Sequence, residues 1–212
     1  MIRLLLADDH TMLRESMATA LRAAGDCVVV AEAGDGVTAI EQALATHPDV
    51  AIVDISMPRL NGIEVVRRLS SELPKTRVLV LTMHEEEEYV LHVVRAGAAG
   101  YLLKHAATVE LLKAVRELAA GGVHFGPYAA KVLADQVQQP QRMPADPYGE
   151  LSAREREVLH LMADGLTTKE ISKKLEISVK TAENHRGRVL AKLGLRNSAE
   201  LVRYAMRKRL VE

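Results

Sequence analysis

The sequence predicts an α/β fold, a doubly wound, five-stranded parallel sheet, followed by a second, smaller all-α domain. Over about the first 120 residues, short apolar runs alternate with segments of helical spacing. The last third is helical and has clear helix start signals. Charge divides the chain in the same way, because residues 1–125 carry a net charge of −5 and residues 151–212 a net charge of +6 within a neutral chain. Two modules with different partners are therefore expected.

Five apolar runs are predicted to form the sheet. Each is nearly continuous instead of alternating with polar residues, as expected of parallel strands that helices cover on both faces. The segments between them have the spacing of amphipathic helices, which favours alternating strands and helices. The predicted strands are Ile2–Ala7, Cys27–Ala33, Val50–Asp54, Arg77–Thr82 and Gly100–Lys104.

A proline-containing stretch separates the two predicted domains. Residues 128–137 form a short amphipathic pattern, and Pro140, Pro144 and Pro147 follow it among glutamine and aspartate residues. This composition is typical of a linker preceded by one helix. The expected division is a first domain at residues 1–122, a linker with one short helix at 123–147, and a second domain at 148–212.

Four helices are expected in the second domain. Two begin with the pattern of a capping box, in which a hydroxyl residue and a carboxylate three positions later satisfy each other's backbone N–H groups. Single polar residues can cap the other two. The predicted caps are Ser152 with Glu155, Thr167 with Glu170, Ser178, and Asn197 or Ser198. Four helices with short turns make a compact bundle.

Charged and polar residues stand at the carboxyl ends of four predicted strands. Asp8 and Asp9 end the first strand, Asp54 the third, Thr82 the fourth and Lys104 the fifth. These ends meet at one edge of an open parallel sheet, where ligands bind. Clustered carboxylates repel one another unless a cation joins them, and Mg²⁺ suits their oxygens. Asp54 can then attack an electrophilic phosphorus, while Lys104 neutralises the phosphoryl oxygens and Thr82 donates a hydrogen bond to one of them.

Four motifs in this region resemble the receiver domain of bacterial two-component response regulators. They are LLADDH, VDISMP, VLT and GYLLK, in this order and at this spacing, and the resemblance spans residues 1 to about 120. It implies that Asp54 accepts a phosphoryl group from a sensor histidine kinase. It also implies Mg²⁺ on Asp9, Asp54 and the main-chain oxygen of Ser56, with Asp8 in support.

The same resemblance assigns further roles and shows one departure. Lys104 is the expected counter-ion of the phosphate, and Thr82 with Tyr101 is the expected switch pair. Family members often have proline in a cis peptide after the lysine, whereas this chain has His105. Because a non-proline cis bond costs about 3 kcal/mol, the sequence leaves the geometry of this peptide open.

The basic second domain contains a helix-turn-helix pattern. Two helical segments within residues 166–195 are joined by a tight turn at residues 175–178, which is the spacing of this motif. In the second helix Ala182, Val189 and Leu193 form an inward-facing stripe. A helix N-terminus with serine, lysine and threonine suits phosphate contacts, and outward asparagine and arginine side chains can read base edges.

This domain is similar to the LuxR-type DNA-binding domain over residues 148–212. Joined to a receiver, it implies the NarL/FixJ class of response regulators, which switch sequence-specific DNA binding to regulate transcription. The residues expected to contact DNA are Thr168, Lys169, Ser178, Lys180, Thr181, Glu183, Asn184, His185, Arg188 and Lys192. Glu183 stands where some members carry lysine, so the operator of such a relative does not transfer to this chain.

Composition indicates a cytoplasmic protein without a membrane partner. Cys27 is the single cysteine, and the N-terminus has no signal-peptide pattern. No apolar run approaches the roughly 18 residues of a transmembrane helix. The expected partners are a sensor histidine kinase, double-stranded promoter DNA and a second copy of the chain when it is phosphorylated or bound to DNA. RNA polymerase is a further candidate.

Two other functions fit parts of the sequence. One is a phosphatase or kinase that uses Asp54, but the chain has neither a GxxxxGK[ST] nor a GxGxxG loop. It also has Ser56 where phosphatases of the dehalogenase type need a second aspartate. The other is a regulator whose helical tail binds protein, against which the basic charge and the helix-turn-helix argue. The main expectation is therefore a transcription regulator that catalyses only its own phosphotransfer and slow dephosphorylation.

Overall fold

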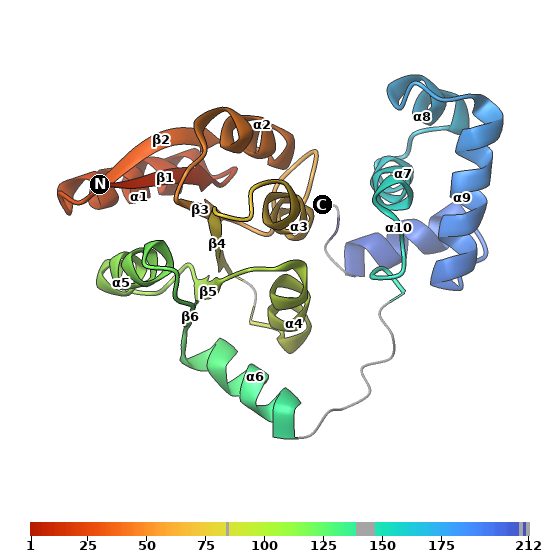
Figure 1. Cartoon of the computed structure of the whole chain (residues 1–212). Helices are drawn as coiled ribbons and strands as arrows, with labels where there is room; N and C mark the ends of the chain where they lie inside the picture. Colours follow the sequence, from red (N-terminus) through yellow and green to blue (C-terminus); the bar gives the residue numbers. More distant parts are fainter. Residues whose placement is uncertain (84, 139–146, 208–209, 211–212) are drawn as a thin grey trace. The chain divides into compact units, whose positions relative to one another are not determined.

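The computed structural model divides the chain into two compact units, Met1–Pro140 and Gln141–Glu212 (Figure 1). It describes residues 1–83, 85–138, 147–207 and 210. The predicted linker prolines Pro140 and Pro144 lie outside the described residues. None of the described helices combines the length and the apolar character that crossing a bilayer requires.

The first unit is built on a parallel sheet of six strands, one more than the sequence predicts. The strand order is β2-β1-β3-β4-β5-β6, and every neighbouring pair is parallel. The extra strand, β6, has two residues, which is too short to produce an apolar run, and it forms by pairing with β5. The strands are β1 (Ile2–Ala7), β2 (Cys27–Ala33), β3 (Val50–Val53), β4 (Arg77–Thr82), β5 (Gly100–Leu103) and β6 (His124–Phe125).

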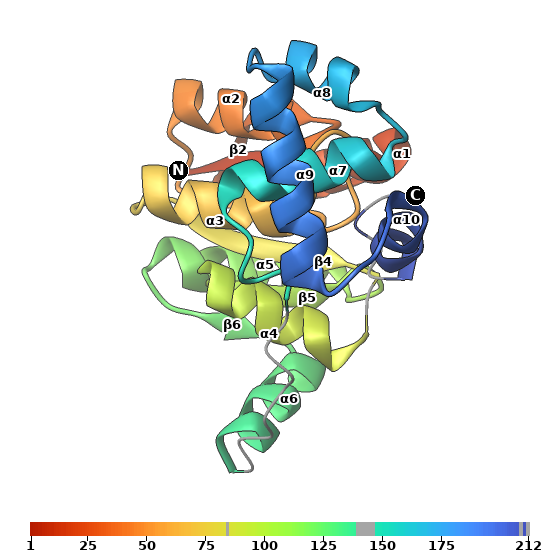
Figure 2. The ribbon, with the colours of Figure 1, turned by 90° about the vertical axis from the view of Figure 1, so that its right-hand side faces the viewer.

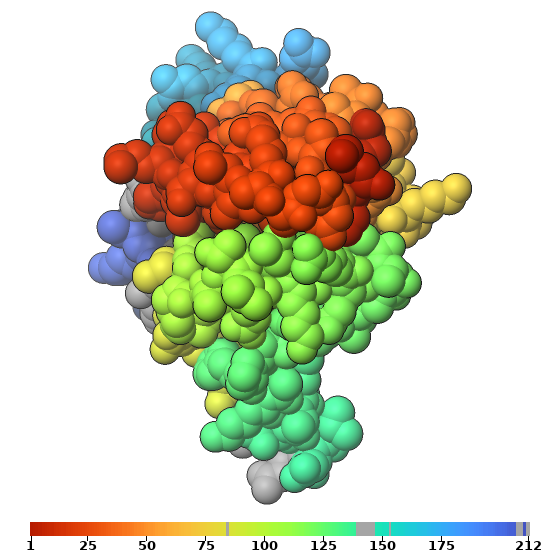
Figure 3. Space-filling model, turned by 90° about the vertical axis from the view of Figure 1, so that its left-hand side faces the viewer, coloured from red at the N-terminus to blue at the C-terminus, as the bar shows by residue number. Residues whose placement is uncertain are grey.

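The described residues of this unit form six helices, and the first five cover both faces of the sheet. They are α1 (Thr11–Ala23), α2 (Gly36–Thr46), α3 (Gly62–Glu72), α4 (Glu87–Ala96), α5 (Thr108–Ala119) and α6 (Pro127–Gln138). Helices α1 and α5 lie on one face, which Figure 3 shows, and α2, α3 and α4 lie on the other (Figures 1 and 2). The doubly wound architecture is therefore confirmed.

The helical cover explains why the strands are apolar on both sides. In β1, Leu4 and Leu6 pack into a core with Leu21 of α1 and Leu118 of α5. Leu5 lies between them in the sequence and points to the other face, yet it is also fully buried. Because side chains alternate across a strand, burial of three successive leucines requires helices on both faces.

Helix α6 packs against α4 and so belongs to the first unit. The amphipathic pattern predicted at residues 128–137 forms this helix, which begins at Pro127. Its buried side chains are Ala129 and Val132, which are 1% and 4% exposed. A helix that the sequence places in a linker is thus held by the domain before it.

The second unit is a bundle of four helices with the expected caps. Both capping boxes are present, the Ser178 hydroxyl accepts from the Thr181 N–H, and Asn197 accepts from the Glu200 N–H. Its core includes Val158, Ile171 and Leu201. The helices are α7 (Ala153–Ala163), α8 (Thr168–Lys174), α9 (Val179–Leu193) and α10 (Ser198–Arg207).

The docking of α6 gives a prediction with a closely matched control. Ala129→Asp should lower the free energy of unfolding of the first unit by about 2–3 kcal/mol, the scale of losing one or two buried aliphatic side chains. Ala130→Asp makes the same change one residue later at an exposed position and should cost less than about 0.5 kcal/mol. Urea unfolding followed by circular dichroism measures both, and equal losses would contradict the docking.

Candidate functional site

The parallel register brings the predicted pocket residues to one edge of the sheet. Asp8 follows β1, Asp54 follows β3, Thr82 ends β4 and Lys104 follows β5. Backbone hydrogen bonds continue past the strand ends, because the Asp54 N–H donates to the Ala7 oxygen at 2.9 Å and the Lys104 N–H to the Thr82 oxygen at 2.8 Å. Each side chain therefore leaves a fixed backbone position.

An ammonium group bridges two carboxylates inside this pocket. The Lys104 Nζ lies 2.8 Å from the Asp54 Oδ2 and 2.8 Å from the Asp8 Oδ2. All three side chains are 5% exposed or less. The Asp9 side chain is 25% exposed and lies at the rim, where the His10 Nδ1 is 2.9 Å from its Oδ1 and 3.2 Å from the Asp8 Oδ1. The structure thus brings together the acidic residues and the lysine that the sequence places at separate strand ends.

Burial and charge act in opposite directions on the groups of the pocket. Burial raises the pKa of Asp54, and the charge of Asp8 adds to this, against the lowering by Lys104. Burial opposes the charge on Lys104, but hydrogen bonds to Asp54 and Asp8 outweigh it and raise the pKa of the lysine. Lys104 therefore stays positively charged, and the pocket favours a further cation that would offset its carboxylates.

The donor set of the pocket fits a hard divalent cation. Ligand atoms of Asp8, Asp9, His10 and Asp54 all lie within 4.8 Å of one another. The Asp9 Oδ1 is buried and accepts no hydrogen bond from the described residues, although the His10 nitrogen is near. A buried carboxylate oxygen that accepts no hydrogen bond is open to a metal ion, and oxygen ligands suit Mg²⁺.

The loop after Asp54 depends on a glycine that sequence analysis did not single out. A Cβ added at Gly62 would lie 1.9 Å from the Asp54 carbonyl oxygen, so no other residue fits without moving the backbone. The Gly62 N–H donates to the Ile55 oxygen at 2.8 Å, and the Ile55 N–H donates to the Asp54 Oδ1 at 2.7 Å. The loop that carries Ser56 is thereby folded back onto the Asp54 carboxylate. The Asn-Gly pair at residues 61–62 is a turn signal that points to this loop.

The two residues of the predicted switch pair are both buried. Thr82 is fully buried and Tyr101 is 1% exposed. Burial raises the pKa of the Tyr101 phenol above its ordinary value, so this hydroxyl keeps its proton. Tyr101 pairs with Val80 of β4 on one side and with Phe125 of β6 on the other. Tyr101 is therefore attached through the sheet to the segment that enters α6.

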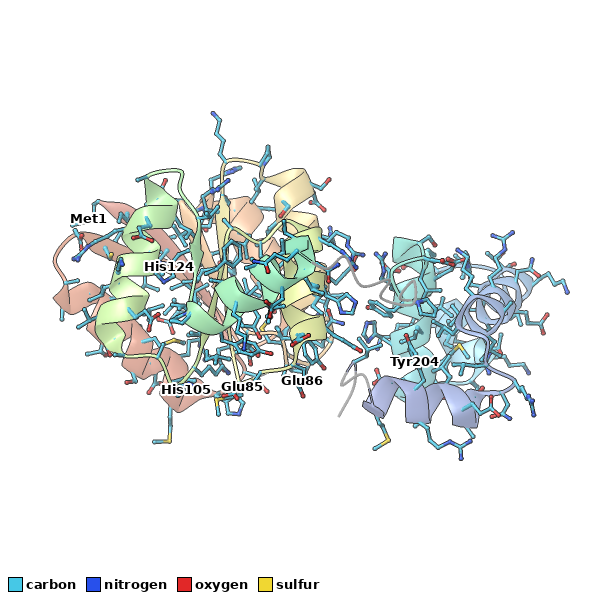
Figure 4. The ribbon with its side chains drawn as sticks, turned by 90° about the horizontal axis from the view of Figure 1, so that it is seen from below. Met1, Glu85, Glu86, His105, His124 and Tyr204 are labelled. Atoms are coloured by element: carbon cyan, nitrogen blue, oxygen red, sulfur yellow. The ribbon has the colours of Figure 1, made fainter. Side chains whose placement is uncertain are left out.

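The peptide after Lys104, left open by the sequence, is trans, because the described residues contain no cis peptide bond. The His105 side chain is exposed, and its Nδ1 lies 3.9 Å from the Glu85 Oε1. Figure 4 shows His105 beside Glu85 and Glu86, away from His124. The trans peptide still delivers Lys104 to both aspartates, so the pocket does not depend on proline at this position.

In the second unit α8 and α9 form a helix-turn-helix. Glu176 in the turn has a left-handed backbone with φ 53°. Ala182, Val189 and Leu193 of α9 are buried, as the predicted stripe requires. Seven of the ten predicted DNA-contacting residues are exposed. They are Lys169 on α8, Ser178 at the start of α9, and Lys180, Glu183, Asn184, Arg188 and Lys192 on α9.

The remaining predicted contacts differ in how free their side chains are. Lys169 is exposed, whereas Thr168, Thr181 and His185 are half-buried. The Lys192 Nζ donates to the Glu155 Oε2 at 2.7 Å and to the Glu150 oxygen at 3.0 Å. The hydrogen bond from Lys192 lowers the pKa of Glu155 to about 2. Lys192 thus joins α9 to the start of α7, a structural contact that the sequence does not reveal.

Comparisons with known proteins match both units. Residues 4–116 match the family of response regulator receiver domains, and residues 149–205 match the LuxR family of bacterial regulatory proteins. The chain is 38% identical over 216 residues to the oxygen regulatory protein NreC of Staphylococcus aureus strains RF122 and MRSA252, covering all of each chain. This chain belongs to the NarL/FixJ class of response regulators.

Solved structures of other response regulators have the same fold. The regulator ChrA of a heme-sensing two-component system is 35% identical with a TM-score of 0.54, covering 99% of this chain and 98% of that one. RcsB bound to DNA is 28% identical with a TM-score of 0.60, covering 97% and 98%. This response regulator is therefore a phosphorylation-regulated, DNA-binding transcription factor.

A buried histidine in the DNA-binding unit of the response regulator was not singled out by the sequence. His160 is 8% exposed, and its Nε2 lies 3.2 Å from the Tyr148 hydroxyl. Burial lowers the pKa of His160 below 6.5, and the nearby Arg156 adds to this against Asp164. The folded unit thus holds a neutral imidazole that the unfolded chain would protonate more readily.

This linkage predicts an acid-sensitive DNA-binding unit. Below pH 6.5 the unfolded chain binds a proton at His160 that the folded unit does not, so stability falls as pH falls, by up to about 1.4 kcal/mol per pH unit. His160→Phe removes this slope, whereas His105→Phe, at an exposed position, keeps it. Urea unfolding between pH 7 and 5 gives the slopes. If the free energy of unfolding of His160→Phe and of the wild type changed with pH by the same slope, His160 would not be the cause of the acid sensitivity.

Proposed function

We propose that Asp54 is the phosphoryl acceptor of this response regulator, and that Lys104, Thr82 and a Mg²⁺ ion held by Asp8, Asp9, Asp54 and the Ser56 main-chain oxygen act on the transferred group. The observation that carries this proposal is the Lys104 ammonium placed 2.8 Å from both Asp54 and Asp8. A buried carboxylate beside a fixed cation and further carboxylates is the arrangement that phosphoryl transfer to aspartate requires.

The residues of the chain supply positioning and charge for the transfer. One Asp54 oxygen forms a bond to phosphorus while the bond from phosphorus to the histidine nitrogen of the kinase breaks. The electron pair of that bond stays on the nitrogen, and the ring leaves as neutral imidazole because its other nitrogen already carries a proton. The Ile55 N–H holds the Asp54 Oδ1, so the carboxylate is oriented before the phosphoryl donor arrives. Lys104 then neutralises a phosphoryl oxygen. When bound, Mg²⁺ supplies charge neutralisation between the carboxylates and the phosphoryl group.

The new phosphoryl group changes what Thr82 and Lys104 contact, and this is the proposed switch. A hydroxyl that hydrogen-bonds to the phosphoryl group favours one arrangement of Tyr101 over another, which shifts the population of receiver states. The receiver carries out its own phosphotransfer and slow dephosphorylation. Its proposed partners are a sensor histidine kinase, promoter DNA, a second copy of the chain when phosphorylated or on DNA, and RNA polymerase. A cytoplasmic location is part of the same proposal.

The acceptor assignment is tested with a small-molecule phosphoryl donor. Acetyl phosphate and Mg²⁺ should add one phosphoryl group to the full chain, detected by intact-protein mass spectrometry. Asp54→Asn should abolish the addition, because an amide oxygen does not replace the nucleophilic carboxylate. Asp135→Asn, at an exposed position on α6, should label like the wild type. Full labelling of Asp54→Asn would show that another residue is the acceptor.

The positions of residues on the exposed face of α9 predict which of them contact bases and which contact phosphates. Asn184 and Arg188 lie four positions apart, so both can point into the major groove. Alanine at either should cost about 1–3 kcal/mol at the cognate site and little on random DNA. Lys180→Ala should weaken both nearly equally and lower the salt slope by about one, because a lysine on the backbone releases counterions.

The measurement is binding of the phosphorylated full chain to cognate and scrambled duplexes at several salt concentrations. Lys131→Ala, at an exposed position on α6, controls for loss of one positive charge outside α9. If Asn184→Ala and Arg188→Ala lose equal affinity on both duplexes, these side chains contact phosphates. The base-reading face of α9 would then be rotated from the one proposed.

A further inference from the structure

Arg14, in the first turns of α1, folds its side chain back over the loop that carries Asp8 and Asp9. Its Nη1 donates a hydrogen bond to the main-chain oxygen of Asp8. The main-chain N–H of Arg14 donates to the main-chain oxygen of His10 at 3.0 Å. The side chain is 16% exposed, so the guanidinium is part of the structure beneath the acidic pocket and not of the surface.

The other side of the guanidinium faces β2 and the turn that follows it. The Arg14 Nε lies 3.5 Å from the Glu32 Oε2, and a Cβ at Gly34 would lie 3.7 Å from Nη1. Arg22, two turns further along α1, contacts the other oxygen of the same carboxylate, with its Nη2 3.1 Å from the Glu32 Oε1. Two arginines of α1 thus share Glu32, but of these two only Arg14 also contacts Asp8 in the described part of the chain.

The hydrogen bond to Asp8 acts on the peptide that joins the two acidic residues. The Asp8 N–H is fixed by the Ala33 oxygen at 3.1 Å, and the Asp8 carbonyl is fixed by Arg14. The first bond holds the peptide before Asp8, and the bond from Arg14 holds the Asp8–Asp9 peptide. Because a peptide is planar, the orientation of the Asp8–Asp9 peptide fixes the position of the Asp9 Cα, from which the carboxylate at the rim of the pocket extends.

We propose that Arg14 is a positioning residue that sets the affinity of the acidic pocket for its divalent cation by holding the Asp8–Asp9 peptide. The inference rests on the proposed Mg²⁺ site. Groups that orient metal ligands without touching the metal typically change metal affinity by about 10- to 100-fold when they are removed. Arg14 is such a group, because it orients Asp8 and Asp9 and is not itself one of the proposed metal ligands.

The direction in which Mg²⁺ affinity changes when Arg14 is removed distinguishes a positioning role from a purely electrostatic one. An arginine near a cation site repels the cation, so removing a bystander arginine would tighten Mg²⁺ binding. Glu32 neutralises part of the Arg14 charge, which makes that electrostatic gain small. Removing an arginine that positions the ligands frees the Asp8–Asp9 peptide to move and weakens Mg²⁺ binding. Arg14→Ala is therefore expected to raise the Mg²⁺ dissociation constant about 10-fold or more.

The experiment is isothermal titration of Mg²⁺ into the full, unphosphorylated chain. Arg22→Ala is the matched control, because it removes the same charge from the same helix and the same Glu32 partner but has no contact with Asp8. It should leave the dissociation constant within about twofold of the wild type. Arg14→Lys keeps the charge but cannot reach Asp8 and Glu32 together, so it should bind Mg²⁺ about threefold more weakly than the wild type.

Thermal unfolding in EDTA shows whether each variant is folded without metal. If Arg14→Ala is unfolded there, Arg14→Lys decides the question. The inference is overturned if the deciding Arg14 variant binds Mg²⁺ at least as tightly as the wild type. It is also overturned if Arg22→Ala weakens Mg²⁺ binding as much as that variant does. A wild-type chain that binds no Mg²⁺ would instead overturn the proposed metal site. As a second readout, the labelling rate of Arg14→Ala with acetyl phosphate should recover at saturating Mg²⁺.

Discussion

The pocket depends on one electrostatic constraint: two buried carboxylates lie close together and are tolerated because one ammonium lies between them. Asp8 and Asp54 leave neighbouring strands, and Lys104, from the other side of β4, reaches both at 2.8 Å. Without the lysine the two carboxylates would repel each other in a poorly solvated site. With it, the pocket still has excess negative charge through Asp9. The same arrangement thus stabilises the resting sheet edge and leaves a place for a cation and a phosphoryl group.

The backbone around Tyr101 connects this pocket to the end of the first unit. The Gly126 N–H donates to the Tyr101 oxygen at 3.1 Å, and two residues of β6 pair with β5. His124 of β6 is also held by α5, since its Nδ1 lies 2.6 Å from the Glu117 Oε2. Helix α6 follows directly and packs on α4. Tyr101 is therefore joined by backbone hydrogen bonds to the segment that runs from the sheet into α6.

The second unit gains its rigidity from caps and from contacts between distant residues. Two capping boxes fix the starts of α7 and α8. Lys192 joins the end of α9 to Glu155 at the start of α7, and Arg186 of α9 donates to the Ser198 hydroxyl at 2.9 Å. Because these contacts hold α9 on its inner and lateral sides, its polar face with Asn184 and Arg188 remains exposed. Helix α9 of the helix-turn-helix is thus held by a rigid support.

The sequence by itself determined the features that depend on local spacing and residue type. These are the apolar strands, the caps at Ser152, Thr167 and Ser178, and the polar residues at the strand ends that mark the pocket. It could not give the features made by residues far apart in the chain. β6 is too short to have a pattern of its own, and the contacts of Arg14 with Asp8 and Glu32 and of Lys192 with Glu155 join separate elements. The trans peptide at His105 and the close approach at Gly62 also came from the tertiary structure, because packing of the whole unit, and not local preference, fixes the backbone there.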